Sequence, residues 1–175
     1  MTQTKSSLDI KIREESPDDV LAIGRVTTAA FLAAPHTSHT EEFVVDALRR
    51  AGKLAVSRVA THDDEVVGHV AISPTAISGN EVGWYGLGPV SVLPSYQRRG
   101  IGSALIMDAL LVLSSSGAAG CVVLGDPAFY ERFGFSAHAA LTLPGFPPQN
   151  LLAVAFDSSI PKGVVSYHEA FQARS

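Results

Sequence analysis

Two arginines and two glycines stand together in residues 97–102, QRRGIG, directly before an apolar run. Glycine has no Cβ atom, so a ligand can approach its backbone closely. The run 101–113 has polar side chains only at Ser103 and Asp108, which predicts a mostly buried helix. Because a helix N-terminus presents unpaired N–H groups and a partial positive charge, the stretch predicts a phosphate or pyrophosphate site.

Two well-known phosphate-binding patterns fit this stretch poorly. A P-loop requires GxxxxGK followed by Ser or Thr, but the Gly52-Lys53 pair is followed by Leu54. A Rossmann site requires GxGxxG or GxGxxA directly after a strand, whereas Leu105 stands at the third position here and a loop intervenes. Asp126, at the end of the next expected strand, stands where a ribose-binding acid would lie. It keeps dinucleotide binding as an alternative.

A third pattern fits at every position. Residues 92–102, VLPSYQRRGIG, have the form Val-x-Pro followed by Gln/Arg-x-x-Gly-x-Gly/Ala. Further along, residues 129–135, FYERFGF, place a tyrosine on an expected short helix just before Gly-Phe. Together, at this separation, the two stretches resemble the GNAT family of acyl-CoA-dependent acetyltransferases. The FYERFGF version resembles a subgroup of small bacterial members whose acceptors are generally unassigned.

The resemblance implies acetyl-CoA as co-substrate, with its pyrophosphate on backbone N–H groups of the glycine loop. The matching positions are Arg98, Arg99, Gly100, Ile101, Gly102 and Ser103. The arginine side chains are expected to steer the anion more than to hold it. The pantetheine arm is expected to pair like an added β-strand with the strand before the loop, at Val90, Ser91 and Val92. This pairing requires the expected strands 84–93 and 121–124 to part, and Pro89 is a position at which pairing would weaken.

The resemblance also implies a catalytic role for Tyr130, at the position of a tyrosine that protonates the departing thiolate. A thiol pKa of about 8.5 and a phenol pKa of about 10 are close enough for this transfer. A packing role for the ring is the alternative. The resemblance supplies no general base on the strand 121–124, CVVL, which lacks the glutamate that many family members carry. Asp126 is the best-placed acid, and it is equally suited to cap the helix expected at 127–133.

Other polar residues border the expected acceptor site. His36, His39 and Glu41 fall in the helical region that usually lies beside it, although each alone is a typical surface or cap residue. The acceptor is expected to be an amine on a small molecule or a peptide. A coenzyme-binding module without robust catalysis is the alternative to an enzyme.

Composition limits the remaining classes. The 175 residues are 46% hydrophobic with a net charge of -4, which fits a single globular domain over 1–175 and argues against a nucleic-acid partner. No apolar run reaches the roughly 18 residues that span a bilayer, so no membrane partner and a cytoplasmic location are expected. One cysteine, Cys121, excludes an intramolecular disulfide, and the absence of HExxH and CxxC argues against a metal. A homodimer is left open.

The elements that must position these residues follow from hydrophobic periodicity. Helices are expected at 16–31, 40–52, 101–113 and 127–133, and strands at 8–14, 54–61, 66–77, 84–93, 121–124 and 151–156. Residues 142–149 are expected to form a loop. The order predicts a mixed α/β fold of the GNAT type, in which helices flank a mostly antiparallel central sheet that splays at the acyl-CoA site.

Overall fold

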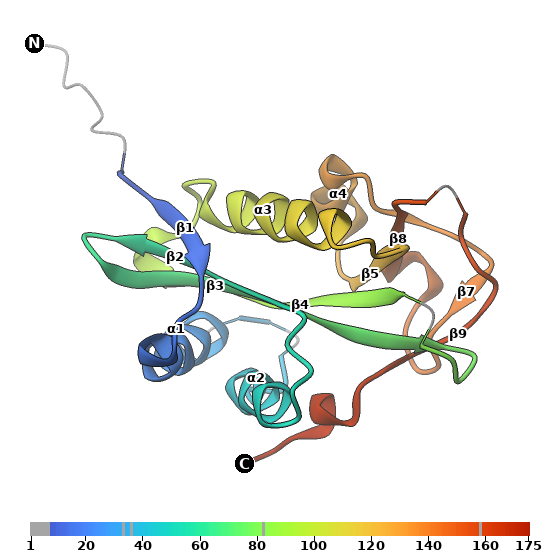
Figure 1. Ribbon diagram of the computed structural model, residues 1–175, viewed down its shortest axis with the longest axis horizontal. Helices are drawn as coiled ribbons and strands as arrows, with labels where there is room; N and C mark the ends of the chain where they lie inside the picture. Colours follow the sequence, from blue (N-terminus) through green and yellow to red (C-terminus); the bar gives the residue numbers. More distant parts are fainter. Residues whose placement is uncertain (1–7, 33, 36, 82, 158) are drawn as a thin grey trace, which may run out of the picture.

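A mixed sheet forms the centre of the molecule (Figure 1). The computed structural model describes residues 8–175 except 33, 36, 82 and 158. The main path of the sheet runs β1-β2-β3-β4-β5-β8-β6, and β9 pairs with the end of β3 and with β7. The strands are β1 (Lys11–Glu14), β2 (Val56–His62), β3 (Glu65–Ile77), β4 (Trp84–Val92), β5 (Gly120–Leu124), β6 (Ser136–Ala137), β7 (Leu141–Thr142), β8 (Leu151–Ala155) and β9 (Gly163–Tyr167). Among the strand pairs of the described residues, only β4–β5 and β7–β9 are parallel, in agreement with the predicted mixed and mostly antiparallel sheet.

Helices cover both faces of the sheet. α1 (Val20–Leu32) and α2 (Glu41–Arg50) lie on one face, and α3 (Ile101–Ser115) and α4 (Pro127–Tyr130) lie on the other (Figure 1). Short 3-10 turns complete the chain: η1 (Pro17–Asp19), η2 (Pro94–Tyr96), η3 (Glu131–Phe133), η4 (Pro148–Asn150) and η5 (Glu169–Gln172). The last of these packs against α2 through Ala170 and Phe171.

α3 confirms the predicted helix after the glycine loop but corrects the prediction that it is mostly buried. Leu105, Ile106 and Leu113 are buried against the sheet. Met107 and Leu111, however, are 63% and 66% exposed. One face of the helix packs on the sheet, and no further layer covers the other face, so apolar residues nearly all round the helix do not make it a core helix.

The predicted helix start at Ser16-Pro17 is confirmed. The Ser16 backbone N–H donates to Asp19 Oδ2 at 2.7 Å, which satisfies one of the donors at the helix start. Arg13 donates to both carboxylate oxygens of Asp19, at 2.7 and 3.0 Å. These hydrogen bonds, above all the one from Arg13, hold the pKa of Asp19 far below its ordinary value. The end of β1 is thereby tied to the start of α1.

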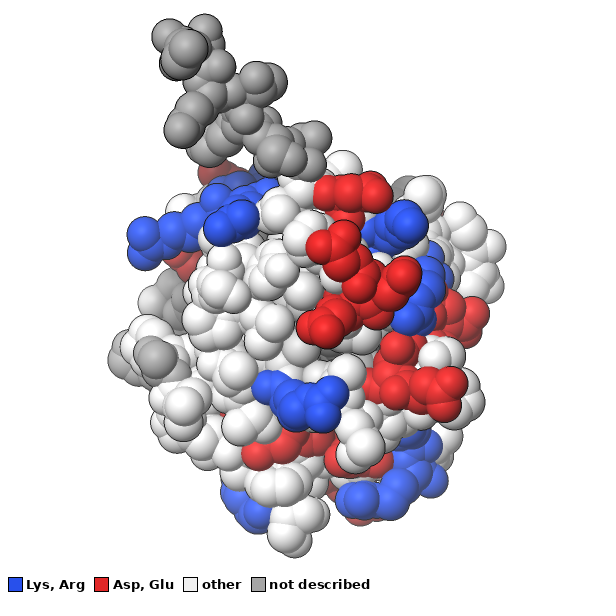
Figure 2. Space-filling model, turned by 90° about the vertical axis from the view of Figure 1, so that its left-hand side faces the viewer, with Lys and Arg blue, Asp and Glu red and all other residues white. Residues whose placement is uncertain are grey.

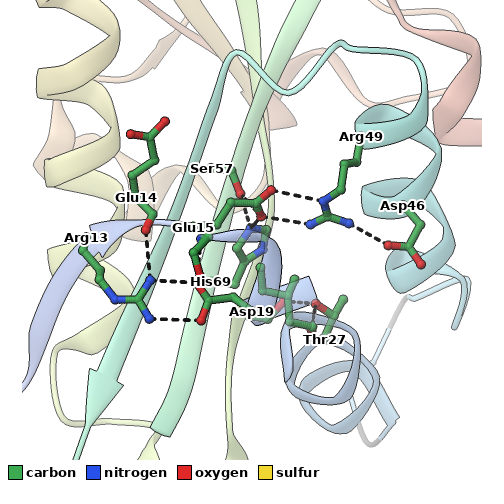
Figure 3. A network of polar contacts seen from close by, with 12 residues as sticks. Arg13, Glu14, Glu15, Asp19, Thr27, Asp46, Arg49, Ser57 and His69 are labelled. Atoms are coloured by element: carbon green, nitrogen blue, oxygen red, sulfur yellow. Dashed lines mark hydrogen bonds and ion pairs between the residues drawn. The ribbon is translucent and has the colours of Figure 1, made fainter. Parts of the chain in front are cut away.

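A partly buried polar network ties α2 to the sheet (Figure 3). Arg49 donates to both Glu15 carboxylate oxygens, at 3.1 and 2.9 Å, and Ser57 Oγ donates to Glu15 Oε2 at 2.6 Å. Ser57 Oγ also lies 2.8 Å from His69 Nε2. Because that hydroxyl gives its proton to Glu15, His69 must donate from Nε2. Burial lowers the pKa of His69 to about 4, so the ring is neutral at neutral pH.

Charged side chains of both signs are interspersed on the surface. Figure 2 shows this for the face at the left-hand end of Figure 1. Two of the ion pairs are Arg13 with Asp19, at 2.7 Å, and Arg58 with Asp108, at 2.6 Å. Of the helices that the described residues form, none is long and apolar enough to cross a membrane.

The predicted parting of two strands is confirmed. β4 pairs with β5 only at Trp84, Tyr85 and Gly86, and beyond Gly86 the two strands separate. β5 stays paired with β8 as far as Leu124. β4 stays paired with β3, but its register shifts between Leu87 and Val90, so that Gly88 and Pro89 form a bulge. A bulge bends its strand, which accounts for the divergence of β4 from β5.

The C-terminal elements were not predicted. β9 and η5 have no counterpart among the expected elements, and β7 and η4 occupy the ends of the predicted 142–149 loop. The first strand is also shorter than the expected 8–14, because only Lys11–Glu14 pairs with β2.

Candidate functional site

The glycine loop forms one side of the site. Gly100 is the N-cap of α3 with φ of 82°, and Arg98 also has a positive φ of 61°. The first N–H of α3 that bonds back to the loop is that of Ala104, which donates to Gly100 O at 3.0 Å. The preceding N–H groups of Ile101, Gly102 and Ser103 have no acceptor in the backbone that the structure describes. They form the positive end of the helix.

A groove of about 320 Å³ lies over this helix end. It brings together six of the predicted cofactor residues, namely Val92, Arg98, Gly100, Ile101, Gly102 and Ser103. Arg99 is not part of its wall, and its guanidinium lies 5.8 Å from the centre of the Tyr96 ring. Val90 and Ser91 also lie outside the groove, further back along β4.

Four further residues line the groove: Tyr96 and Gln97 in the loop before α3, and Phe129 and Arg132. Phe129 and Arg132 line it from the opposite side, and the Arg132 guanidinium lies 4.7 Å from the Phe129 ring centre. Arg132 Nε also donates to Phe129 O at 2.8 Å, which fixes the side chain beside the groove. The sequence shows that Arg132 stands two residues after Tyr130. Whether its side chain faces the groove depends on how α4 continues into η3.

The open edge of β4 faces the gap between the strands. The Leu93 N–H donates to Val67 O, on β3, at 2.9 Å. Because successive residues of a strand point their backbone groups to opposite edges, those of Val92 and Val90 face away from β3. Gln97 agrees with this direction, since its side-chain amide donates to Val92 O at 3.0 Å. The side chain of Ser91 is buried and donates to Thr27 Oγ1 at 3.3 Å.

Tyr130 is held in place by aromatic packing. Its ring lies 4.9 Å from that of Phe129 and 5.9 Å from that of Phe135, both nearly perpendicular. A Cβ atom on Gly125 would collide with the ring, so the glycine makes room for it. Burial raises the pKa of Tyr130 above its ordinary value, which keeps the phenol protonated at neutral pH.

A second tyrosine at the gap was missed from the sequence. Tyr167, on β9, has a buried hydroxyl with no hydrogen-bond partner among the described residues. Burial raises its pKa, and nearby Cys121 and Tyr130 raise it further. No local sequence pattern predicts that Tyr167 lies at the gap, because β9 reaches the gap by pairing with the end of β3.

A cavity of about 760 Å³ opens on the α1–α2 side of the sheet. Leu87, Gly88 and Pro89 of the diverging β4 line it, together with Leu124 at the end of β5. The remaining walls come from the α1–α2 region and the C-terminal segment, namely Phe31, Ser38, Glu41, Val44, Leu143, Pro144, Phe146, Val164, Val165, Ser166, Tyr167, His168, Phe171 and Gln172. The cavity therefore reaches the gap between β4 and β5.

The three polar residues expected beside the acceptor site do not all line the cavity. Glu41 lines the cavity. His39 is exposed and not part of its wall, and His36 lies outside the described residues.

Asp126 serves as a helix cap. Its Oδ1 accepts a hydrogen bond from the Ala128 N–H at 2.9 Å, and the side chain lines neither the groove nor the cavity. Cys121 is fully buried, and burial raises its pKa, as expected for an inert thiol. Over the described parts of the chain, no three His, Cys, Asp or Glu side chains are grouped as a metal site would require.

The parted strands, the glycine loop at a helix N-terminus and the tyrosine helix define an acetyltransferase of the GNAT family, and the chain belongs to this family. A sequence profile described as "Acetyltransferase (GNAT) domain" matches residues 53–137. The chain is 36% identical over 169 residues to "Uncharacterized N-acetyltransferase YhbS" of Escherichia coli, covering 91% of this chain and 97% of the relative.

Two solved structures agree with this assignment. A GNAT family acetyltransferase from Brucella melitensis, in complex with acetyl-CoA, has a TM-score of 0.84 and 46% identity, covering 93% of this chain and 97% of that one. YhbS from Escherichia coli, in complex with CoA, has a TM-score of 0.86 and 32% identity, covering 99% and 98%. The predicted family and fold are thus confirmed.

Proposed function

We propose that the protein transfers the acetyl group of acetyl-CoA directly to a primary amine. One observation carries the proposal: beyond Gly86, where β4 has parted from β5, β4 lines first the cavity, at Leu87 to Pro89, and then the groove, at Val92. A cofactor bound in the groove and along β4 would present its thioester at the gap, where an acceptor in the cavity could reach it. The CoA and acetyl-CoA complexes of the two relatives support acetyl-CoA as the acyl donor.

The groove residues would bind the negatively charged pyrophosphate of the coenzyme. Backbone N–H groups from Arg98 to Ser103 would receive the pyrophosphate, with the positive helix end behind them. Arg98 and Arg132 would add charge on either side of the groove. The open backbone edge at Val90 and Val92 would pair with the amide groups of pantetheine.

The transfer step balances without a covalent intermediate on the enzyme. The amine nitrogen attacks the thioester carbon, the C–N bond forms, and the C–S bond breaks. Tyr130 gives its proton to the departing thiolate, and the proton lost by the nitrogen restores the phenol, directly or through water. Tyr130 is thus the proposed catalytic acid, and Asp126 is left with its capping bond.

Calorimetry and thiol release test this function together. Titration should show saturable binding of acetyl-CoA, and primary amines should accelerate the release of free CoA thiol. Binding without amine-dependent release across a broad amine panel would instead favour a coenzyme-binding module. Absence of acetyl-CoA binding at millimolar concentration would refute the proposal.

A further inference from the structure

We propose that the acceptor is a small monocationic amine on an apolar body, bound in the 760 Å³ cavity with its ammonium group at the Glu41 carboxylate. The inference rests on the proposed function, because it identifies the acceptor of that reaction. It assigns a substrate class to the cavity and a binding role to Glu41.

The walls of the cavity are mainly apolar. They include Phe31, Val44, Leu124, Leu143, Phe146 and Phe171. Phe146 and Val164 are 52% and 45% exposed although both are large and hydrophobic. Apolar surface that faces a concave opening is typical of a site that a ligand covers. A cavity of this volume suits a small molecule with an aryl or alkyl group.

Glu41 supplies the negative charge. Its Oε1 accepts hydrogen bonds from the Thr37 hydroxyl and from the N–H and hydroxyl of Ser38, at 3.2 and 3.3 Å for the latter two. Its Oε2 is buried and has no partner among the described residues. Burial alone would raise the pKa of Glu41, but hydrogen bonding from Thr37, from the backbone N–H of Glu41 itself and from Ser38 outweighs it and lowers the pKa, so the group is a carboxylate at neutral pH.

One carboxylate oxygen is therefore satisfied and the other is not. An unsatisfied buried acceptor on a charged group is costly, and an ammonium group would satisfy it with a charge-assisted hydrogen bond. The lowered pKa also makes Glu41 a poor base towards an ammonium ion. Its role is thus to bind and orient the amine, which loses one proton to solvent before the nitrogen attacks and a second one afterwards, the one that restores Tyr130.

No other charged side chain competes with Glu41 along the described cavity wall. His168 accepts a hydrogen bond at Nδ1 from the Ala170 N–H at 3.1 Å, which places the ring proton on Nε2 and leaves the ring uncharged. Ser38, Ser166, Tyr167 and Gln172 are neutral. One negative charge among apolar walls favours a monocation over a polyamine and disfavours an anionic acceptor.

The test compares 2-phenylethylamine with spermidine as acceptors. We expect kcat/KM at least tenfold higher for 2-phenylethylamine. Glu41→Gln should raise its KM at least tenfold while acetyl-CoA affinity stays within twofold. Glu42→Gln, the same change on the neighbouring residue that does not line the cavity, should leave both values unchanged. A preference for spermidine, or an unaltered KM in Glu41→Gln, would overturn the inference.

A second variant covers the case in which Glu41→Gln fails to fold. Phe146→Ser changes an exposed loop residue of the cavity wall, so it should keep the fold and lower kcat/KM for 2-phenylethylamine about tenfold. An unchanged value would count against the inference.

Saturation-transfer NMR of 2-phenylethylamine with the enzyme–CoA complex gives a readout without turnover. Failure of acetyl-CoA binding refutes the proposed function. Intact acetyl-CoA binding with no NMR signal from 2-phenylethylamine refutes only this inference.

Discussion

The ring of Tyr167 lies directly against the backbone of Gly86, the last residue of β4 that pairs with β5. A Cβ atom on Gly86 would come within 2.5 Å of Tyr167 Cε1. The absence of a side chain at the point where the strands part therefore admits a tyrosine from the far end of the chain.

Gly86→Ala should push this ring out of place. Overpacking at a buried site costs about 1–3 kcal/mol, and the displaced ring would disturb the cavity wall, so we expect lower stability and a raised acceptor KM. Urea unfolding and steady-state kinetics measure both. Gly24→Ala is the matched control, because a Cβ there meets nothing within 4 Å and the helix should gain slightly. Equal effects of the two changes would contradict the packing argument.

Tyr130→Phe should lower kcat about 100-fold, in the range of a lost general acid, with acetyl-CoA affinity nearly unchanged. The aromatic contacts to Phe129 and Phe135 survive, since only the hydroxyl is removed. Thiol release and calorimetry separate the two quantities. Tyr85→Phe, on β4, serves as control, and an unchanged kcat in Tyr130→Phe would exclude its role as acid.

Gly100→Ala and Gly102→Ala should differ although both add one methyl group. Gly100 has φ of 82°, where an L-residue is strained by about 1 kcal/mol, so its variant should lose stability and coenzyme affinity. Gly102 has an ordinary helical position, and a Cβ there would lie 3.8 Å from Val92, a normal contact. Thermal unfolding and CoA titration compare them. A larger loss of coenzyme affinity in Gly102→Ala than in Gly100→Ala would show that space at the groove floor, and not the backbone conformation at Gly100, determines coenzyme binding.

Asp126→Ser separates capping from proton transfer. Serine can accept the Ala128 N–H as aspartate does, whereas alanine cannot and should cost about 1 kcal/mol of stability. We expect the serine variant to keep its activity and the alanine variant to be less stable. A folded serine variant with a large loss of kcat would instead make Asp126 the base.

His69 should make the protein sensitive to mild acid. The folded-state pKa is about 4, below the ordinary 6.5, so the unfolded chain binds a proton between these values when the folded chain does not. His69 should therefore leave the free energy of unfolding unchanged above pH 6.5 and lower it by about 3 kcal/mol as the pH drops to 4. His69→Gln should flatten this part of a urea-unfolding pH series. A slope unchanged by the substitution would contradict the assignment.

The groove at the glycine loop could be predicted because its elements are local in the sequence. The end of β4 at Val92, a glycine at positive φ and a helix N-terminus all lie within residues 92–103, so the motif carries their geometry. The parting of β4 and β5 followed from the same unit. The exposed face of α3 could not be predicted, because the hydrophobicity of a helix does not show whether another element packs on each of its faces.

The acceptor side could not be predicted in the same way. Tyr167 reaches the gap through the pairing of Thr75 with Tyr167 across the β3–β9 ladder, which joins residues far apart in the chain. Glu41 looked like an ordinary residue at a helix start. Its buried and unpartnered oxygen depends on the fold around it.

The parting of β4 and β5 also means that the groove and the cavity are built from different segments of the sequence. The groove is drawn from residues 92–103 and 129–132, and most of the cavity from residues 31–44 and 143–172. On the proposed function, substitutions in the second set would change which amine is accepted without altering the groove that receives the coenzyme. Homologues with the same loop could thus diverge in acceptor while keeping one acyl donor, and transplanting residues 143–172 between them offers a direct route to exchanging specificity.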